Sequence, residues 1–541
     1  MSLSSPETPT GNVQGQRDSS LFRSIIDEPQ LQLKMPYARD TAPSSSMSIV
    51  QQEWTEQECE PYFVDLTALP KSQLDHLRES GILYSRQNDP NNQDSVTGND
   101  EDCPLEIMLL REKHVAYLQQ LWWMGDSTNL PPRPLKAGFI SLDASRTWML
   151  YWTLHACDLL DHQPSLSECH AIFSTIQSCF WTQNIVVPSS QTTVTIGGFG
   201  GGPQQLPHAA TTYAAVNTLV LLTSMTKEQQ HDSSLYSEIV QYLRDTIRGP
   251  LKNWILYQLY NPRDSCADHV AGSFRMHHDG EIDIRASYCI LAVTTLLNID
   301  LTAMGNESAG EDKSVGIVLP DALQFVANCQ TYEGGFGGEP FAEAHGGYTF
   351  CATAAAWLLQ DMLEQRKSTF QTPIDWEALT GWLVRRQMSC EGGFNGRANK
   401  LVDGCYSFWQ GGAMAIVAAQ EQRTRLGQTT STGYDESGDP WLQENTSSSA
   451  YNLGVLFDRP MLERYILLCS QDINGGLRDK PSKTRDFYHS CYTLSGLSVA
   501  QYCQSPDDRG DFGHTSTRVA MTHPVFNLRC ERVRNILWEL A

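Results

Sequence analysis

The sequence predicts a nearly all-α protein built from repeated helix pairs. Five copies of a Gly-Gly-aromatic type of turn run through it, starting at Gly197, Gly272, Gly334, Gly392 and Gly475. A polar stretch follows each turn, and then a helix rich in small residues begins. The copies start 58 to 83 residues apart, which suits a unit of two helices with loops. No alternating pattern of strand length stands out, so strands are not expected.

Apolar residues at helical spacing identify several of these helices. They are expected within residues 105–123, 212–222, 283–297 and 349–363. Repeated helix pairs of this length stack either into an open solenoid or into a closed ring. The period of the repeat alone leaves both arrangements open.

The chain is expected to divide into three parts. Residues 1–50 are rich in Ser, Pro, Thr and Gln and are predicted to be a disordered extension. Residues 51–104 are interpreted as a loosely attached leader, and the helical repeats occupy 105–541. Within the repeats, the polar segment at about 424–449 is predicted to be a surface insertion.

Composition excludes several functional classes. A formal charge of −23 argues against nonspecific binding to nucleic acids or anionic membranes, although a local basic pocket remains possible. The fifteen cysteines lie in apolar surroundings without C-x-x-C pairs, which is typical of reduced thiols in a cytoplasmic protein. No apolar run approaches the ~18 residues that a membrane span requires.

One candidate metal site follows from residue types and spacing. Asp403 and Cys405 stand two apart across a glycine, so both side chains can reach one cation. His489 occupies the equivalent place in the next repeat and completes a carboxylate, thiolate and imidazole set. Three protein ligands leave a fourth position open, as in catalytic zinc sites. The alternative is a common Asp-Gly turn, a buried thiol and a core histidine.

A candidate anion site precedes it in the chain. Arg397 and Lys400 follow one Gly-rich turn, His345 takes the matching place in the preceding repeat, and Arg285 comes from repeat two. Guanidinium, ammonium and imidazole groups near helix starts suit a diphosphate. In the alternative, these cations pair with surface carboxylates.

Aromatic residues recur where inner helices would face one another. In a solid ring they would form the core, and in a funnel they would line an apolar pocket. The residues are Trp148, Tyr151, Trp152, Tyr213, Tyr288, Tyr348, Cys351, Tyr406 and Trp409.

Five motifs together resemble a known family. They are DGCYSFWQGG, HGGYTFC, GRANKLVDG, GGFGGGPQQLPH and KTRDFYHSCYTLSGLS, and the similarity runs from about Leu105 to the C-terminus. They look like motifs of the β subunits of protein prenyltransferases. Among these subunits, they resemble those of farnesyltransferases most closely. The resemblance implies an α/α toroid (an α6/α6 barrel) of six helical hairpins around a central cavity.

The resemblance also implies an activity and partners. The family's β subunit pairs with a helical-repeat α subunit in an obligate heterodimer. With zinc, and with Mg²⁺, it transfers farnesyl from farnesyl diphosphate to the cysteine of C-terminal C-a-a-X motifs, for example in small GTPases.

Functional residues are carried over by motif position. The implied zinc ligands are Asp403, Cys405 and His489, with Lys400 and Tyr406 also catalytic. Farnesyl diphosphate would contact His345, Gly346, Gly347, Tyr348, Arg397, Lys400, Tyr406, Trp409, Arg285, Tyr288 and Cys351. The peptide would contact Trp148, Trp152, His208 and Tyr488, and Asp479 would bind Mg²⁺ through the diphosphate.

Two of these residues favour farnesyl over a longer lipid. Trp148 is bulky where the type I geranylgeranyltransferase β subunit has a small residue, and Asp479 stands where that relative has lysine. The type I geranylgeranyltransferase β subunit remains one alternative. A non-catalytic toroid scaffold is another, from a different functional class. A terpene cyclase would need an acidic D-x-D-D motif, which the sequence lacks.

Overall fold

The computed structural model describes residues 47–60, 71–85, 105–124, 137–188, 190–229, 233–263, 266–302, 316–366, 373–427, 439–442, 456–502, 513 and 515–541. Most of the predicted extension at 1–50 and of the predicted insertion at 424–449 lies outside these ranges. The chain divides into two compact units, Met1–Ile49 and Val50–Ala541, and the helical repeats belong to the second.

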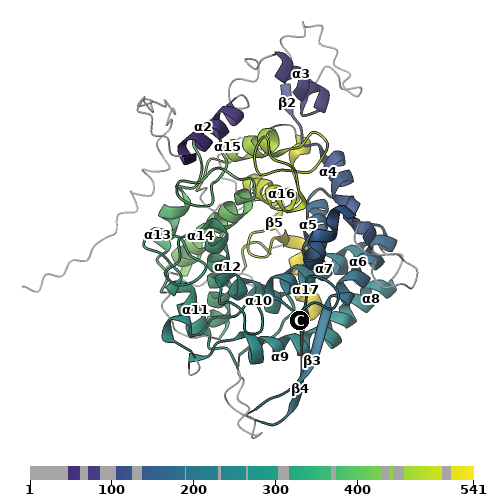
Figure 1. Cartoon of the computed structure of the whole chain (residues 1–541), viewed down its shortest axis with the longest axis vertical. Coiled ribbons are helices and arrows are strands. Elements are labelled where there is room, and N and C mark those ends of the chain that lie inside the picture. Colours follow the sequence, from purple (N-terminus) through teal and green to yellow (C-terminus); the bar gives the residue numbers. More distant parts are fainter. Residues whose placement is uncertain are drawn as a thin grey trace, which may run out of the picture. The chain divides into compact units, whose positions relative to one another are not determined.

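Six helices of the described chain form an inner ring, which Figure 1 shows end-on. They are α5 (Arg146–Leu159), α7 (Ala209–Glu228), α10 (Ile284–Leu296), α12 (Gly346–Gln365), α14 (Tyr406–Gly427) and α16 (Phe487–Tyr502). Each packs against the next in this order, and α16 packs back against α5. This last contact closes the ring, so the repeats form a toroid and not an open solenoid.

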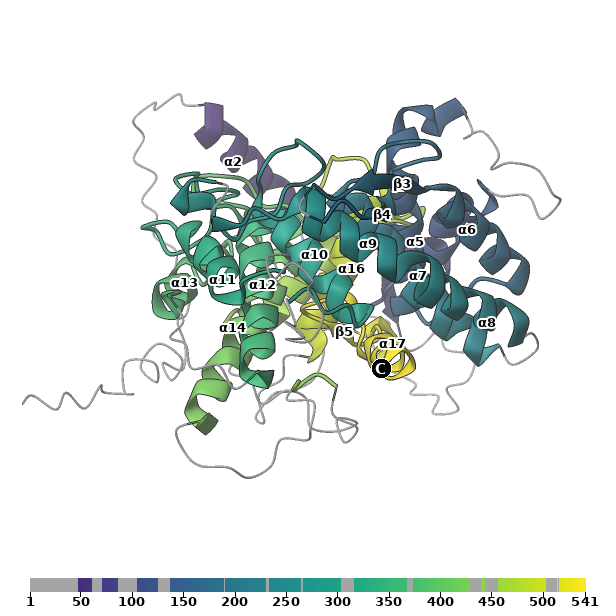
Figure 2. The same cartoon turned by 90° about the horizontal axis from the view of Figure 1, so that it is seen from below.

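Shorter helices cover the outside of the ring, as Figure 2 shows from below. They are α4 (Arg111–Leu118), α6 (Leu166–Ser178), α8 (Ser233–Gln241), α9 (Arg248–Trp254), α11 (Leu319–Asn328), α13 (Trp376–Leu383) and α15 (Arg459–Arg464). The helices α11, α13 and α15 pack on α12, α14 and α16. Inner helices are buried nearly all round, which explains their small and apolar composition.

The turns between helices carry glycine because each turn packs on the backbone of another repeat. Gly334 has φ +102°, a conformation that residues with a Cβ rarely adopt, and a Cβ there would lie 2.0 Å from the carbonyl oxygen of Ala378 in α13. In the last repeat, a Cβ at Gly475 would lie 1.9 Å from the carbonyl oxygen of Lys113 in α4. The last turn therefore packs on the first outer helix, which closes the ring on its outer side as well.

Short 3-10 and π segments complete the helical part of the described chain. They are η4 (Gln119–Met124), η5 (Ala137–Ser145), η6 (Tyr242–Ile247), η7 (Ile255–Leu259), η9 (Asp268–Val270), η10 (Tyr465–Ser470) and η11 (Thr515–Thr517). Helices α2 (Met47–Cys59) and α3 (Lys71–Ser80) precede the ring, and α17 (Cys530–Leu540) follows it. None of the described helices combines the length and apolarity needed to cross a bilayer.

Three small antiparallel hairpins interrupt the helical pattern. The longest pairs β3 (Phe180–Val186) with β4 (Thr193–Phe199), and Phe180 lies opposite Phe199. The others pair β1 (Leu83–Ser85) with β2 (Leu105–Ile107) and β5 (Thr522–His523) with β6 (Leu528–Arg529). The expectation of no strands was too strict, because the β-branched residues of 192–196 lie in a largely exposed two-stranded ribbon.

The C-terminal turn at 523–527 closes the ring where three inner helices meet. The hydroxyls of Tyr151, Tyr213 and Tyr288 donate to the carbonyls of Asn527, Phe526 and Val525 at 2.8, 2.9 and 2.8 Å. Beyond the turn, α17 is fixed by the buried guanidinium of Arg532, which lies 2.9 Å from the Asp158 carboxylate. These bonds hold the turn against α5, α7 and α10 and hold α17 against α5.

Candidate functional site

The inner helices begin at a common rim of the ring. His345 is the N-cap of α12, and its ring lies 3.0 Å from the hydroxyl of Tyr406, the first residue of α14. The Arg285 guanidinium at the start of α10 lies 5.6 Å from the Tyr348 ring centre on α12. Since helix amino ends carry unpaired N–H groups and a positive end of the helix dipole, this rim favours anions.

Three predicted metal ligands converge at this rim. Potential ligand atoms of Asp403, Cys405 and His489 all lie within 4.8 Å of one another. Among the described residues, these three side chains form the group that could hold a metal ion. The Asp403 carboxylate lies 3.3 Å from His489 Nε2 and accepts the N–H of Cys405 at 2.9 Å. Asp403 and Cys405 precede α14 and His489 lies in the first turn of α16, so the packing of α14 against α16 brings two neighbouring repeats together at this point.

Asp486 is a functional residue that the sequence interpretation missed. Its carboxylate accepts the backbone N–H of His489 at 2.7 Å and the ring Nδ1–H at 2.6 Å. With Nδ1 donating to Asp486, Nε2 is the ring nitrogen that faces Asp403, and it can bind a metal once it loses its proton. A histidine held by a carboxylate in this way is the usual arrangement around zinc ligands. The signal in the sequence was an aspartate three residues before the histidine, at the start of a helix.

The electrostatics of the cluster fit a bound cation. Although burial opposes the charged form, hydrogen bonds and charges from Asp403 and Asp486 raise the pKa of His489 to about 10. Burial, and then the Asp403 carboxylate, raise the pKa of the Cys405 thiol well above its usual value. In the chain without metal a proton on His489 thus balances two carboxylates, a role that Zn²⁺ can take over. A donor set of one carboxylate, one thiol and one imidazole suits zinc.

The hydrogen bonds of His345 leave the hydroxyl of Tyr406 able to donate. Burial lowers the pKa of His345, which favours the neutral ring, and its Nδ1 accepts the N–H of Gly347 at 3.2 Å. The ring proton therefore lies on Nε2, which donates to the Tyr406 oxygen. Burial raises the pKa of Tyr406, so this hydroxyl keeps its proton and can donate it to an anion.

Predicted anion-binding residues lie here, but several already have partners. Arg397 pairs with Glu343, and Arg285 forms a bidentate pair with Asp283 at 2.8 and 2.7 Å. The side chain of Lys400 is exposed. The pairing of cations with nearby carboxylates, which the sequence left open, is therefore present for both arginines.

The two glycines after His345 use their N–H groups within the protein. Gly346 donates to the carbonyl of Gly396 at 2.7 Å, and Gly347 donates to His345. A Cβ at Gly346 would lie 2.4 Å from the side-chain nitrogen of Gln410. Gly346 thus allows α12 and α14 to approach closely.

Asp479, the predicted magnesium ligand, lies beside the metal cluster. Its carboxylate pairs with Lys480 at 2.6 Å, and its carbonyl accepts the N–H of Gly404 at 2.7 Å. Burial, and then the negative charge of Asp403, raise the pKa of Asp479. A second cation at this carboxylate would compete with Lys480.

An aromatic wall runs from the metal cluster toward the C-terminal turn. The indole of Trp409 donates to the Tyr488 hydroxyl at 3.1 Å, and the rings of Trp152 and Tyr488 lie 5.5 Å apart. Trp148 stacks on Trp152 at 5.4 Å and contacts Tyr213. Because Trp148, Trp152, Trp409 and Tyr488 are only partly buried, they line open space and do not sit in a solid core.

The deeper part of the wall is fully packed. Tyr288 and Cys351 are 3% and 6% exposed, so they lie behind the partly exposed aromatic residues. Tyr492, which the sequence interpretation did not single out, stacks against Trp409 with ring centres 4.2 Å apart. Its place one helical turn after Tyr488 was the available signal.

Comparison with known proteins decides the family. The family model described as "Prenyltransferase alpha-alpha toroid domain" matches residues 109–528. The protein farnesyltransferase subunit beta of Pisum sativum is 36% identical over 461 residues, covering 78% of this chain and 93% of the relative. The chain belongs to the family of protein farnesyltransferase β subunits.

Further relatives agree with this membership. The protein farnesyltransferase subunit beta of Schizosaccharomyces pombe is 36% identical, covering 72% of this chain and 78% of that protein. A geranylgeranyl transferase type-1 subunit beta from Arabidopsis thaliana is 31% identical over only 42% of this chain. The solved structure of Candida albicans protein geranylgeranyltransferase-I complexed with GGPP matches with TM-score 0.54 and 20% identity, over 80% of this chain and 100% of that one. The toroid expected from the sequence is confirmed.

The contacts that place His208 are with residues other than those predicted to bind the peptide. It caps α7 by accepting the N–H of Ala210 at 3.2 Å, and its ring lies 5.7 Å from that of His277. The prediction that it lies near a peptide carboxylate stays a prediction.

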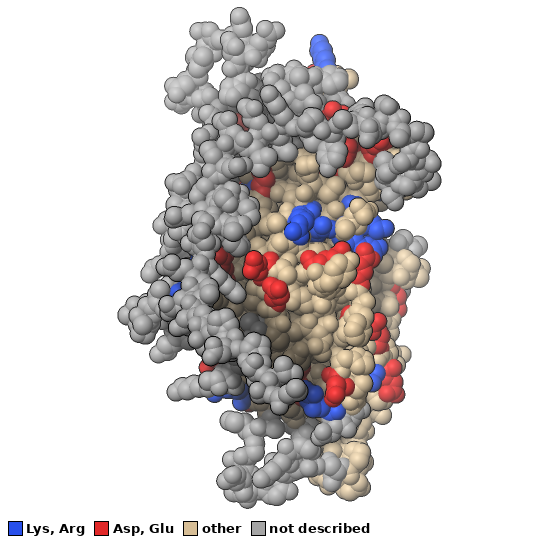
Figure 3. Space-filling model, turned by 90° about the vertical axis from the view of Figure 1, so that its left-hand side faces the viewer, with Lys and Arg blue, Asp and Glu red and all other residues tan. Residues whose placement is uncertain are grey.

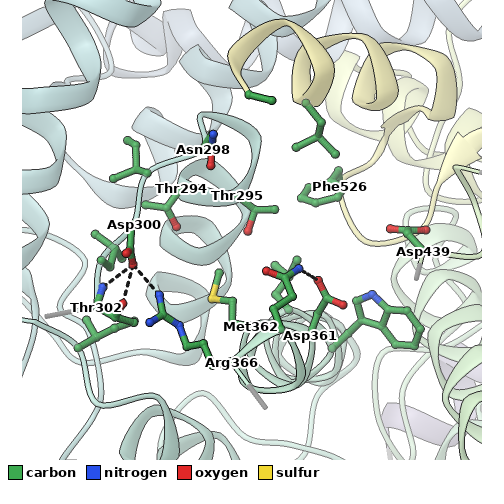
Figure 4. Close-up of a pocket in the computed structure, with 18 of the residues that line it drawn as sticks. Thr294, Thr295, Asn298, Asp300, Thr302, Asp361, Met362, Arg366, Asp439 and Phe526 are labelled. Carbon is green, nitrogen blue, oxygen red and sulfur yellow. Dashed lines mark hydrogen bonds and ion pairs between the residues drawn. The ribbon is translucent and has the colours of Figure 1, made fainter. Parts of the chain in front are cut away.

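The prenyltransferase ring also contains a hollow of about 530 Å³ away from the metal cluster. Figure 4 shows its walls at the carboxyl ends of α10 and α12, with Asp300 bonded to Thr302 and Arg366, and Phe526 of the C-terminal turn on the other side. Acidic groups and helix carboxyl ends do not suit an anion. The hollow is therefore not a second diphosphate site.

Surface charge on the described outside of the ring is mixed. On the face shown in Figure 3, acidic and basic side chains lie near one another among broad uncharged surface. The described part of this face therefore carries no continuous positive patch.

Zinc binding to the metal-free chain should release protons. His489, with a pKa of about 10, and Cys405, with a raised pKa, are both protonated near neutral pH, and both must lose a proton to become ligands. We expect about two protons per zinc and an affinity that rises with pH across the neutral range. Titration calorimetry in buffers of different ionisation enthalpy measures this number, and zero proton release would contradict the proposed ligand states.

Asp486→Asn should weaken zinc binding while preserving the helix. Asparagine caps helices as well as aspartate does but cannot hold the imidazole with a negative charge. We expect zinc affinity to fall about 10- to 100-fold, the range for outer carboxylate partners of ligating histidines. Asp458→Asn is the matched control, because Asp458 caps α15 in the same way without contacting a ligand. Equal zinc affinities for both variants would remove Asp486 from the metal site.

Proposed function

We propose that the chain is the catalytic β subunit of a zinc-dependent protein farnesyltransferase. Its substrates are farnesyl diphosphate and proteins that end in a C-a-a-X motif. The observation that carries the proposal is the position of the Asp403, Cys405 and His489 cluster beside the His345 and Tyr406 pair at one rim. A nucleophile and a leaving anion can be held next to each other only where such groups adjoin.

The rim residues act on the diphosphate. The Tyr406 hydroxyl donates to a phosphate oxygen, because His345 Nε2–H already supplies its oxygen with a hydrogen bond. Lys400 and Arg397 offset the negative charge that grows on the leaving group, and Arg397 exchanges Glu343 for a phosphate oxygen. Asp479 contributes a carboxylate to a Mg²⁺ ion bound with the diphosphate, in exchange for Lys480.

The aromatic wall holds the isoprenoid. Trp409 and Tyr348 line its path from the rim, and Trp148 limits its depth, because it stands in front of the packed Tyr213. Trp152 and Tyr488 lie on the side where an acceptor peptide can contact both the lipid and the metal cluster. The wall also excludes water from the carbon that is attacked.

Bond making then follows from these positions. The peptide sulfur forms a bond to C1 of the farnesyl group as the bond between C1 and the diphosphate oxygen breaks, so a thioether and diphosphate result. Zinc, when bound, lowers the pKa of a cysteine thiol, which is ordinarily about 8.5, and thereby supplies the thiolate. Asp403, Cys405 and His489 hold the ion, and Asp486 keeps the imidazole oriented.

A second subunit and a cellular location complete the proposal. We propose a prenyltransferase α subunit as obligate partner, by analogy with the relatives' description as β subunits. None of the described cysteines forms a disulfide, and the cytoplasm is the proposed location.

The decisive experiment is co-expression with a candidate α subunit. The purified complex should contain about one zinc per β subunit and transfer farnesyl in preference to geranylgeranyl to a C-a-a-X peptide. A Cys405→Ser complex serves as the control, with zinc and transfer both lost. A zinc-free wild-type complex, or transfer that prefers the twenty-carbon lipid, would overturn the proposal.

Trp148→Thr should enlarge the lipid site. Removing the indole opens space in front of Tyr213, so the kcat/KM ratio of geranylgeranyl to farnesyl diphosphate should rise by about 10-fold or more. Steady-state kinetics with both lipids measures the ratio. Trp538→Thr, at an exposed position of α17, should leave it unchanged. An unaltered ratio for Trp148→Thr would exclude this residue as the limit on lipid length.

A further inference from the structure

Helix α2, which precedes the ring in the chain, is bound to the last two repeats. The Gln52 amide donates to the buried Glu391 carboxylate at 2.8 Å, and the Glu58 carboxylate accepts the Ser482 hydroxyl at 2.6 Å. Trp54, in contrast, is 60% exposed and points away from these contacts. One face of α2 is therefore docked on the repeats.

The docked face ends at Cys59, the last residue of α2. Its side chain is completely buried, and its thiol lies within hydrogen-bonding reach of the Cys469 thiol in η10. Thr55, one helical turn earlier, is also buried. A buried thiol between two elements acts as a small apolar contact, so α2 packs on η10 and not only on surface polar groups.

The segment η10 in turn holds one end of the loop at 478–486. The Tyr465 hydroxyl donates to the carbonyl of Asp479 at 2.6 Å. The carbonyls of Ser470 and Cys469 accept the backbone N–H and the guanidinium of Arg478 at 2.9 and 3.1 Å. These bonds fix the backbone of residues 478 and 479.

This loop supports the metal cluster from both ends. At its first end, the Asp479 carbonyl accepts the N–H of Gly404, the residue between two metal ligands, and a Cβ on Gly404 would lie 2.8 Å from the Arg478 carbonyl. At its last end, Asp486 holds His489 Nδ1 at 2.6 Å. A shift of the loop would therefore change the spacing between the Asp403–Cys405 turn and His489.

We propose that α2 is a positioning element of the metal centre. Gln52 anchors the helix on Glu391 in the turn of repeat four, Glu58 holds the loop at 478–486, and Cys59 packs on η10. Tyr465 is the positioning residue that transmits this support to Gly404. The inference rests on the proposed function for the identity of the metal as zinc. It assigns a role to a segment outside the toroid, which the repeat pattern does not explain.

The test measures zinc affinity in the full-length complex with its α subunit. Gln52→Glu places two carboxylates together at Glu391 and should release the start of α2, and Tyr465→Phe removes only the hydroxyl that holds Asp479. We expect each to weaken zinc binding by about 10-fold, the lower end for outer-shell changes, and to alter the visible absorption of the Co²⁺-substituted complex. Chelator competition gives the affinity.

Rescue and control variants separate positioning from general stability. Adding Glu391→Gln to Gln52→Glu restores a hydrogen bond in the reverse sense and should restore zinc affinity. Trp54→Ala, on the exposed face of the same helix, should leave affinity and the Co²⁺ spectrum unchanged. Circular dichroism at the assay temperature establishes that each variant is folded.

The possible results distinguish failure of the positioning role of α2 from failure of the proposed function. Wild-type zinc affinity in both Gln52→Glu and Tyr465→Phe would overturn the positioning role while leaving the proposed function intact. Failure of Glu391→Gln to rescue would likewise overturn it, since the loss would then not arise from this contact. A wild-type complex that binds no zinc would instead overturn the proposed function.

Discussion

The ring depends on the close approach of each Gly-Gly turn to the backbone of another repeat. A Cβ at Gly334 or Gly475 would lie within about 2 Å of a carbonyl oxygen on the neighbouring outer helix. The contact of Gly475 with Lys113 joins the last repeat to the first outer helix and complements the packing of α16 on α5. The inner and the outer layer of helices therefore both close into a ring. Neighbouring inner helices start at the same rim, and their amino ends adjoin there.

That shared rim explains how one surface serves two chemistries. Positive helix ends, His345 and Tyr406 suit an anionic leaving group, while Asp403, Cys405 and His489 suit a cation. The two sets adjoin because α14 contributes Tyr406 to the first and follows Asp403 and Cys405 of the second. The salt bridge of Arg397 with Glu343 holds this guanidinium at the rim.

The motifs predicted three metal ligands that the structure brings together, but they did not predict the groups that support these three residues. Asp403, Cys405 and His489 were predicted and do converge. Tyr492 and the carbonyl of Asp479 were not, because their contacts join segments that are far apart in the sequence. Asp486 was also missed, although it lies only three residues before His489. The β3–β4 ribbon was missed because buried and exposed residues do not alternate regularly along either strand. Roles of Lys400, His208 and the individual lipid contacts remain predictions.

The sequence by itself determined the helical repeat, the five turns and the residue types of the metal and anion sites. These features depend on the local conformational preferences of residues and on short sequence motifs. The tertiary structure decided that the ring closes, that Lys480 and Glu343 are the present partners of Asp479 and Arg397, and that α2 lies against η10. Apart from the pair of adjacent residues Asp479 and Lys480, these contacts join residues tens to hundreds of positions apart, and only the packing of the whole chain selects them. The spacing of the repeats in the sequence does not indicate which of these contacts form.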